Sequence, residues 1–271
     1  MPSAAPSALK APVYFLHINK TAGTSFATVA QRAFPVERTC PAGLVPELLS
    51  LPAPWIKSYD YFGGHFGLGL PSLLPRGQAE ALTIFTLLRD PVDRVISQIN
   101  AHFRNPGTAL HKAVVERRGD VNACLAEPEI AHMLADYQTR SLGLPLDLAA
   151  LKIQGPPFRG LQELTAEAAR GVDPEALLAR AKQTLDRCAM IGLAERFDES
   201  VRWLARWLGV PHDGPAPRRN VSAFNPDTGK PNALSRADLS AATIHRLEEI
   251  NRLDIALYEH ATRLFEARRA A

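Results

Sequence analysis

Residues 13 to 26 constrain the fold of this chain more than any other stretch. The apolar run from Val13 to Ile18 does not alternate with polar residues, which is typical of a buried parallel strand. A polar turn and small residues around Gly23 then lead into a helical apolar pattern. The stretch predicts a strand, a turn and a helix, with backbone N–H groups and Lys20 placed to meet an anion where the helix begins. An ordinary turn with a solvated lysine is the alternative interpretation.

Residues 82 to 88 form a second candidate for a buried strand, which ends at Arg89. Asp90 is a typical N-cap and Pro91 a typical first helical residue, so a helix is predicted to begin there. Open α/β sheets bind ligands at the carboxyl ends of their strands. Arg89, and Ser97 about two helical turns further on, are therefore predicted to face a ligand, although Arg89 could instead pair with a neighbouring carboxylate.

The remaining pattern alternates strands with helices. Residues 59 to 66 are predicted to run from a strand into a glycine turn that carries His65, and residues 188 to 193 to form another inner strand. We therefore expect an α/β fold, a P-loop-like parallel sheet flanked by helices, with a helix-rich elaboration over about residues 108–187. Residues 1–11 are expected to be a flexible leader, and residues 12–271 a single domain.

The helical pattern is most regular in a few stretches. The first helix is predicted to be capped by Thr21 or Thr24 and to end at Pro35. Further helices are predicted at residues 127–142, 173–187, 195–208 and 235–268.

Composition excludes several classes of protein. The net charge of +3 is small, and the basic residues are spread along the 271-residue chain, so a nucleic-acid partner is not expected. No apolar run approaches the ~20 residues that cross a bilayer, and the N-terminus lacks the pattern of a signal peptide. Three widely spaced cysteines fit no disulfide framework, so a cytoplasmic location is expected. The oligomeric state cannot be read from the sequence.

The first turn differs from the phosphate-binding loop of ATP and GTP enzymes. The pattern GxxxxGK[ST] is absent, and Lys20 precedes the small residues where that pattern places its lysine after them. No acidic residue that ends a strand is placed to bind Mg²⁺, and the histidines lack the spacing of metal ligands. We expect no metal, and an ATP- and Mg²⁺-dependent phosphotransferase is the second hypothesis.

Two motifs, in order, resemble those of one enzyme family. Residues 17–26, HINKTAGTSF, resemble the 5′-phosphosulfate loop of sulfotransferases that use 3′-phosphoadenosine 5′-phosphosulfate (PAPS), particularly the carbohydrate and heparan-uronosyl 2-O type and their bacterial relatives. Asn19 stands where the usual bacterial loop has proline. Residues 89–97, RDPVDRVIS, are similar to the family's 3′-phosphate motif. Further matches are residues 64–66, 137–140, 192–200 and 251–258.

The resemblance implies transfer of a sulfuryl group from PAPS to the hydroxyl of a glycan or a small molecule. His65 is the candidate general base, since unperturbed histidine titrates near ~6.5 and the family places a histidine after a comparable glycine. Lys20 would stabilise the departing phosphate. The residues expected to bind the nucleotide are Lys20, Thr21, Ala22, Gly23, Thr24, Ser25, Arg89, Ser97, Arg219 and Ser222. A nucleotide-binding protein without catalysis is the third hypothesis.

Two positions near these motifs have no assigned contact with a ligand. Arg94 is interpreted as facing solvent. Residues 137–140 are interpreted as facing either the acceptor or the core, because their helix needs an apolar face.

Overall fold

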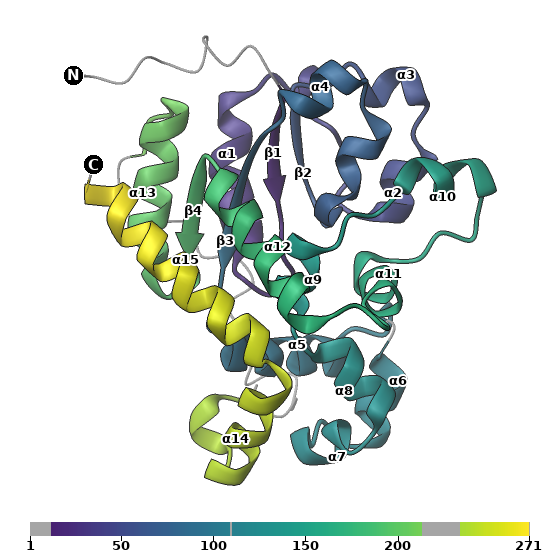
Figure 1. Ribbon diagram of the computed structural model, residues 1–271, viewed down its shortest axis with the longest axis vertical. Helices are drawn as coiled ribbons and strands as arrows, with labels where there is room; N and C mark the ends of the chain where they lie inside the picture. Colours follow the sequence, from purple (N-terminus) through teal and green to yellow (C-terminus); the bar gives the residue numbers. More distant parts are fainter. Residues whose placement is uncertain (1–11, 109, 213–233, 271) are drawn as a thin grey trace, which may run out of the picture.

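The computed structural model describes residues 12–108, 110–212 and 234–270 (Figure 1). Within these residues, four parallel strands form one sheet in the order β2-β1-β3-β4. The strands are β1 (Val13–Leu16), β2 (Tyr61–Gly64), β3 (Thr83–Leu88) and β4 (Met190–Leu193). In the register of the sheet, the end of β1 at Leu16 lies beside Gly64 and Thr86. The predicted α/β fold with a parallel sheet is therefore confirmed.

Helices separate the strands. Those before β4 are α1 (Gly23–Ala30), α2 (Val45–Ser50), α3 (Ala53–Ile56), α4 (Arg76–Glu80), α5 (Pro91–Arg104), α6 (His111–Glu116), α7 (Val121–Leu125), α8 (Pro128–Leu134), α9 (Tyr137–Gly143), α10 (Leu148–Gln154), α11 (Leu161–Ala168) and α12 (Pro174–Arg187). Those after β4 are α13 (Phe197–Leu208), α14 (Ala241–Ile250) and α15 (Arg252–Ala270). The helix-rich elaboration predicted between β3 and β4 is thus present, as α6 to α12.

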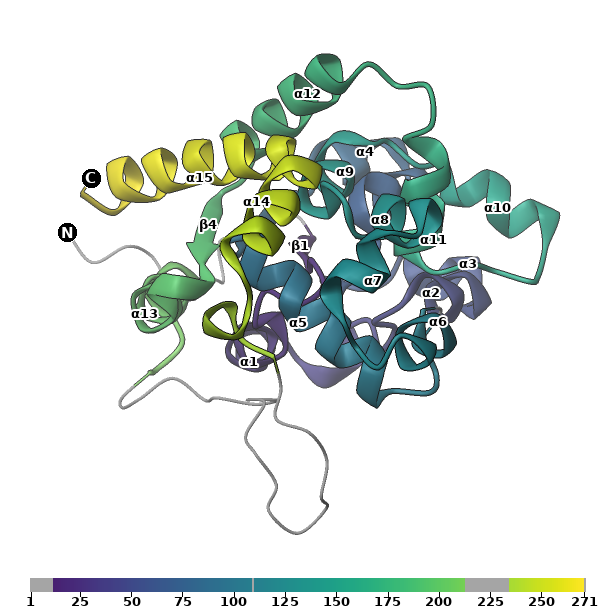
Figure 2. The same ribbon diagram turned by 90° about the horizontal axis from the view of Figure 1, so that it is seen from below.

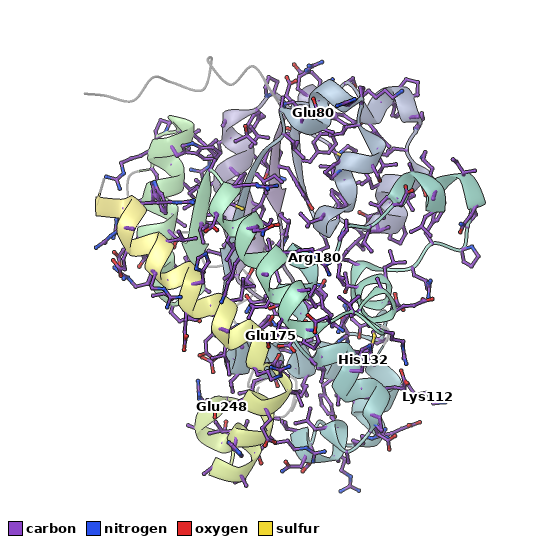
Figure 3. All side chains as sticks on the ribbon, in the orientation of Figure 1. Glu80, Lys112, His132, Glu175, Arg180 and Glu248 are labelled. Atoms are coloured by element: carbon purple, nitrogen blue, oxygen red, sulfur yellow. The ribbon has the colours of Figure 1, made fainter. Side chains whose placement is uncertain are left out.

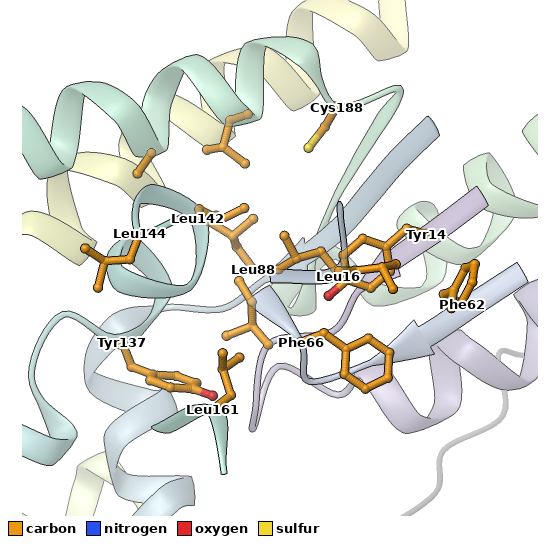
Figure 4. Packing of buried hydrophobic residues seen from close by; sticks show 14 of the residues in the cluster. Tyr14, Leu16, Phe62, Phe66, Leu88, Tyr137, Leu142, Leu144, Leu161 and Cys188 are labelled. Carbon is orange, nitrogen blue, oxygen red and sulfur yellow. The ribbon is translucent and has the colours of Figure 1, made fainter. Parts of the chain in front are cut away.

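Both faces of the sheet are covered by helices (Figure 1). Alternate residues of a strand point to opposite faces. Val13 and Phe15 pack with α1 and α13 on one face, while Tyr14 and Leu16 pack with α9, α12 and α15 on the other. Figure 4 shows part of this second cluster. A third apolar cluster joins α5 to α6, α7, α8 and α14, beyond the carboxyl ends of the strands.

The helix predicted over residues 127–142 is broken into α8 and α9. The break falls at Asp136, whose φ of 45° lies in the left-handed region. This conformation lets Asp136 Oδ1 accept the backbone N–H groups of Leu253 and Asp254, at the start of α15. Asp254 in turn accepts the N–H groups of residues 138 and 139, at the start of α9. The two helices therefore cap each other across more than a hundred residues of sequence, which no local pattern predicts.

Arg94 does not face solvent as predicted but is fully buried. Its Nη2 donates to the Leu134 carbonyl at 2.8 Å, and its Nε lies 3.9 Å from Asp254 Oδ2. Its guanidinium carbon is 5.3 Å from the centre of the Tyr137 ring, and that of Arg140 is 5.8 Å from the same centre. Residues 137–140 are buried, so they face the core and not an acceptor. Figure 4 shows Tyr137 in the apolar cluster.

Two of the predicted helix starts are confirmed. Asp90 and Asp173 accept backbone N–H groups at the starts of α5 and α12. The cap predicted for the first helix is wrong, since Ala22 is the N-cap of α1 and no side chain caps that helix. Thr21 instead donates its hydroxyl to the backbone carbonyl three residues earlier, and Thr24 lies within the helix.

The helix predicted over residues 235–268 is two helices, α14 and α15. The break falls at Asn251, which is fully buried. Its amide donates to the Leu247 carbonyl at 2.8 Å and accepts the Asp136 N–H at 3.1 Å. A side chain that satisfies two backbone groups from different segments is best placed at a helix boundary, because the ends of helices leave such groups unpaired.

The outer surface is charged, as Figure 3 shows for Glu80, Lys112, Glu175 and Glu248. In the part of the chain that the structure describes, no helix is long and apolar enough to cross a bilayer. The three cysteines are all buried and unpaired. The single domain expected over residues 12–271 stays a prediction, and the leader predicted at residues 1–11 lies outside the described ranges.

Removing the charge of Asp254 should destabilise the protein strongly. In Asp254→Asn, an amide group faces the N–H groups at the start of α9, and the buried cation of Arg94 loses its counter-charge. We expect a loss of about 3–5 kcal/mol in the free energy of unfolding, measured by urea denaturation. The control is Asp60→Asn at the half-exposed pair with Arg38, which should cost at most about 1 kcal/mol. Equal effects of the two substitutions would contradict this account.

Candidate active site

The carboxyl ends of β1, β2 and β3 open into one cleft of about 1170 Å³. Figure 2 looks toward this edge of the sheet, with α5 and α14 across it. The cleft is lined by most of the residues that the sequence singled out, which arrive from three different strand ends. These are Lys20, Ala22, Gly23, Thr24, Ser25, His65, Arg89 and Ser97. Among the described residues Thr21 is the exception, because its side chain is fully buried and only its backbone remains for a ligand.

The loop after β1 has an unusual backbone. Lys20 and Ala22 have φ angles of 71° and 67°, in a region that residues with a side chain seldom adopt. Arg89 Nη1 donates to the Lys20 carbonyl at 3.2 Å, and this bond helps to hold the turn. Turns of this kind gather backbone N–H groups into an anion-binding concavity, and the uncapped start of α1 adds the positive end of the helix dipole.

Gly23 is required by the ring of His17. A Cβ atom at position 23 would lie 2.2 Å from both Cδ2 and Nε2 of that ring. The ring is stacked on Phe15, with the ring centres 5.0 Å apart. Glycine therefore lets a histidine lie against the start of α1, at the inner wall of the cleft.

His65 is held in the tautomer that a general base needs. Its Nδ1 lies 2.6 Å from the backbone carbonyl of His17, which can only accept a hydrogen bond. The proton is therefore on Nδ1, and Nε2 keeps a free lone pair. Burial, together with the charge of Lys20, lowers the pKa of His65 to about 4, although the bond to His17 opposes this shift. The imidazole is thus neutral at physiological pH.

Lys20 is a half-buried cation without a carboxylate partner in the described chain. Burial, followed by the positive charges of Arg104 and Arg89, lowers the pKa of its ammonium group. Each of these causes disfavours a positive charge in the cleft. A bound anion would relieve the repulsion among the cations, so the electrostatics favour an anionic ligand.

Arg89 has no carboxylate partner either, so its alternative interpretation as half of a salt bridge is wrong within the described residues. The carboxylate of Asp90 instead accepts the backbone N–H of Asp93 and a bond from Arg236 Nη1 at 3.3 Å. Arg89 therefore keeps donor groups free in the cleft, which the half-buried Ser97 also lines. A planar guanidinium beside a hydroxyl is well suited to a phosphate.

Several lining residues were missed by the sequence analysis. Arg236 reaches Asp90, 146 positions away in sequence, and also approaches Glu248 at 3.4 Å. Glu195 accepts the Asp90 N–H and the hydroxyl of Tyr258. Glu195 and Tyr258 lie in residues 192–200 and 251–258, two of the segments that resemble the sulfotransferase family. This resemblance was the only signal in the sequence for their side of the cleft. Nothing local in the sequence points to Arg236.

Two of the predicted nucleotide ligands, Arg219 and Ser222, lie outside the described residues. So does Arg218. Within the described residues, no group of three or more His, Cys, Asp or Glu side chains is placed to hold a metal ion.

The fold and the cleft define the chain as an α/β protein with cations and a neutral histidine at the carboxyl edge of a parallel sheet. No family model matches the chain. Its sequence is 24% identical over 287 residues to Heparan-sulfate 6-O-sulfotransferase 3 of Mus musculus, a match that covers 94% of this chain and 58% of the mouse protein. The chain thus spans little more than half the length of that relative. Among solved structures it matches a sulfotransferase from Alicyclobacillus acidocaldarius, with 16% identity and a TM-score of 0.39 over 90% of this chain and 96% of the other.

The chain is therefore similar in sequence to an enzyme named as a sulfotransferase, which agrees with the resemblance of its motifs. The mouse relative is named a 6-O enzyme, whereas the first loop resembles the uronosyl 2-O type. The match thus supports the family and does not select a branch.

Unfolding should become easier below pH 6.5 because of His65. The unfolded side chain titrates near ~6.5, and the folded one near pH 4, so between these values the unfolded chain binds more protons. Stability therefore falls as the pH drops from about 6.5 to about 4. The substitution His65→Gln should flatten this slope by up to ~1.4 kcal/mol per pH unit in urea titrations. The exposed His245→Gln is the control, and an unchanged slope in His65→Gln would refute the assignment.

Proposed function

We propose that the chain transfers a sulfuryl group from PAPS to the hydroxyl group of an acceptor. The observation that carries this proposal is the one cleft that joins Lys20, Arg89 and the neutral His65. Two separate cationic positions fit a nucleotide with two separate phosphate groups, and the histidine supplies a base between them and the acceptor. Similarity to an enzyme named as a sulfotransferase supports the same chemistry.

Each end of the nucleotide has its own group of ligands in this proposal. Lys20 and the N–H groups of residues 21–25 bind the 5′-phosphosulfate at the start of α1. Arg89 and Ser97 bind the 3′-phosphate at the start of α5. The bond from Arg89 Nη1 to the Lys20 carbonyl ties the two groups of ligands together, so the spacing between the phosphate sites is set by the protein.

The reaction is an in-line displacement at sulfur. The acceptor oxygen forms a bond to sulfur while His65 Nε2 takes its proton. The bond from sulfur to the bridging oxygen breaks, and its electron pair stays on the departing 5′-phosphate, so the products are a sulfate ester and adenosine 3′,5′-bisphosphate. Lys20 and the loop N–H groups stabilise the charge that grows on this phosphate more strongly in the transition state than in the ground state.

The acceptor is proposed to be a hydroxyl-bearing glycan or small molecule. The name of the mouse relative refers to heparan sulfate and favours a glycan. The part of the cleft that Arg196, Glu199 and Arg202 line is moderately charged. Arg196 is paired with Glu199, while the exposed Arg202 has no ion-pair partner in the described chain. This balance suits an acceptor with few negative charges, and a labelled transfer assay against pooled glycans and hydroxyl metabolites would identify it.

Some expectations from the sequence stay predictions. Arg219 and Ser222 are proposed as further ligands of the nucleotide. No metal is required by the proposed reaction, no nucleic-acid partner is proposed, and the cytoplasmic location is still a prediction. Magnesium-dependent binding of ATP, tighter than that of adenosine 3′,5′-bisphosphate, would favour the phosphotransferase hypothesis instead.

Lys20→Ala should weaken nucleotide binding. The substitution removes a charged donor from the 5′-phosphate, and such bonds contribute enough free energy to lower affinity for adenosine 3′,5′-bisphosphate at least about tenfold. Isothermal titration calorimetry measures the change. Lys112→Ala, at an exposed lysine of α6 (Figure 3), is the control and should bind like the wild type. Unchanged binding in Lys20→Ala would rule out the proposed phosphate site.

His65→Gln should separate catalysis from binding. Glutamine can still donate to the His17 carbonyl but cannot take the acceptor proton, so kcat should fall by about 10²–10⁴. Affinity for adenosine 3′,5′-bisphosphate should change by less than about twofold, because His65 contacts no phosphate in the proposed reaction. Retained turnover in this variant would assign the base elsewhere. If the wild type binds the nucleotide but modifies no acceptor in a broad panel, the third hypothesis, a non-catalytic nucleotide-binding protein, is favoured.

A further inference from the structure

The backbone of Arg89 is held by a single buried amide, that of Gln138 in α9. Gln138 Oε1 accepts the Arg89 N–H at 3.0 Å, and Gln138 Nε2 donates to the Arg89 carbonyl at 2.9 Å. Gln138 is fully buried and does not line the cleft. Any effect of this residue on a ligand is therefore indirect, and Arg89 is the cleft residue that its side chain contacts.

Arg89 needs such a partner because of its place in the chain. The strand β3 ends at Leu88 and the helix α5 begins at Pro91, so Arg89 belongs to neither element. Its N–H and carbonyl groups would be unpaired in a half-buried position without Gln138. At neutral pH an amide side chain carries a donor and an acceptor side by side, whereas a carboxylate can only accept, so asparagine or glutamine can pair with both groups at once.

Gln138 is itself held in place by a residue of α15. Its own N–H donates to Asp254 Oδ2 at 3.1 Å, in the reciprocal caps of α9 and α15. The neighbouring residue Tyr137 accepts a bond from Asn19 Nδ2 at 3.4 Å. The first two residues of α9 thus contact both segments that are proposed to bind phosphate, the loop after β1 and the segment after β3. Asn19, which departs from the usual loop sequence, makes one of these contacts.

We propose that Gln138 is a positioning residue that directs Arg89 toward the 3′-phosphate of the nucleotide. The inference rests on the proposed function, in which Arg89 binds that phosphate. A guanidinium must be aligned to form two parallel bonds with a phosphate, and it loses them when its backbone turns. The amide of Gln138 fixes the backbone direction from which the arginine side chain extends.

The test compares two nucleotides that differ only in the 3′-phosphate. Adenosine 3′,5′-bisphosphate and adenosine 5′-monophosphate are titrated calorimetrically into the wild type, Arg89→Ala and Gln138→Met, since methionine fills a similar volume without hydrogen bonds. The ratio of the two affinities measures the contribution of the 3′-phosphate. We expect Gln138→Met to lower this ratio about tenfold, approaching Arg89→Ala, with affinity for the monophosphate changed by less than about twofold.

A second substitution gives a rescue that a general loss of packing would not show. Gln138→Glu keeps an acceptor for the Arg89 N–H but can donate to the Arg89 carbonyl only when the new carboxyl group is protonated. The ratio of the two nucleotide affinities in this variant, relative to that of the wild type, should therefore recover as the pH falls. Gln162→Met is the control, because that half-buried glutamine donates to the Met133 carbonyl and accepts a bond from Gln98 but contacts neither Lys20 nor Arg89.

Three outcomes would overturn the inference. One is a wild-type ratio in Gln138→Met. Another is an equal loss of affinity for both nucleotides, which indicates general damage to the fold. A wild type that does not distinguish the two nucleotides would overturn the proposed function itself, and the inference with it.

Discussion

The buried carboxylate of Asp254 is the interaction on which the site depends. It comes from the last helix, α15, and satisfies the start of α9 with both of its oxygens. A carboxylate that accepts several N–H groups in a dry interior has one preferred position, because each unmade bond there is expensive. The start of α9 is therefore fixed relative to the sheet, and so is the amide of Gln138 that reaches Arg89.

The same region places two buried cations behind the cleft. Arg94 and Arg140 lie within 6 Å of the Tyr137 ring centre, at 5.3 and 5.8 Å. Burial lowers the pKa of both guanidinium groups, and the carboxylate of Asp254 opposes that shift. The carboxylate of Asp136 opposes it as well, and burial together with the charge of Asp254 raises the pKa of Asp136 to about 7. The charges of the two arginines are therefore balanced by Asp254 and partly by Asp136, and ionic interactions in this buried region are weakly screened by salt.

Features with a local cause could be predicted from the sequence. The strand and turn at residues 13–26, the Asp90 cap and the placement of His65 after a glycine strand all follow from patterns a few residues long. The break at Asp136 and the burial of Arg94 could not be predicted. Their partners lie far along the chain, at residues 253 and 254 for Asp136 and residue 134 for Arg94. In the sequence, a side chain that forms a hydrogen bond with a distant backbone group cannot be told apart from any other polar residue on a helix.

The contact between His17 and Gly23 links two positions in the evolution of the chain. Any side chain at position 23 would overlap the imidazole ring of His17 at 2.2 Å, and His17 also supplies the backbone carbonyl that orients His65. A larger residue at position 23 can therefore be accepted only after His17 has been replaced by a smaller residue. If Gly23 is replaced first, the protein has a damaged site until position 17 also changes. Relatives that carry a larger residue at position 23 should therefore also lack the histidine at position 17, and the two positions should change together.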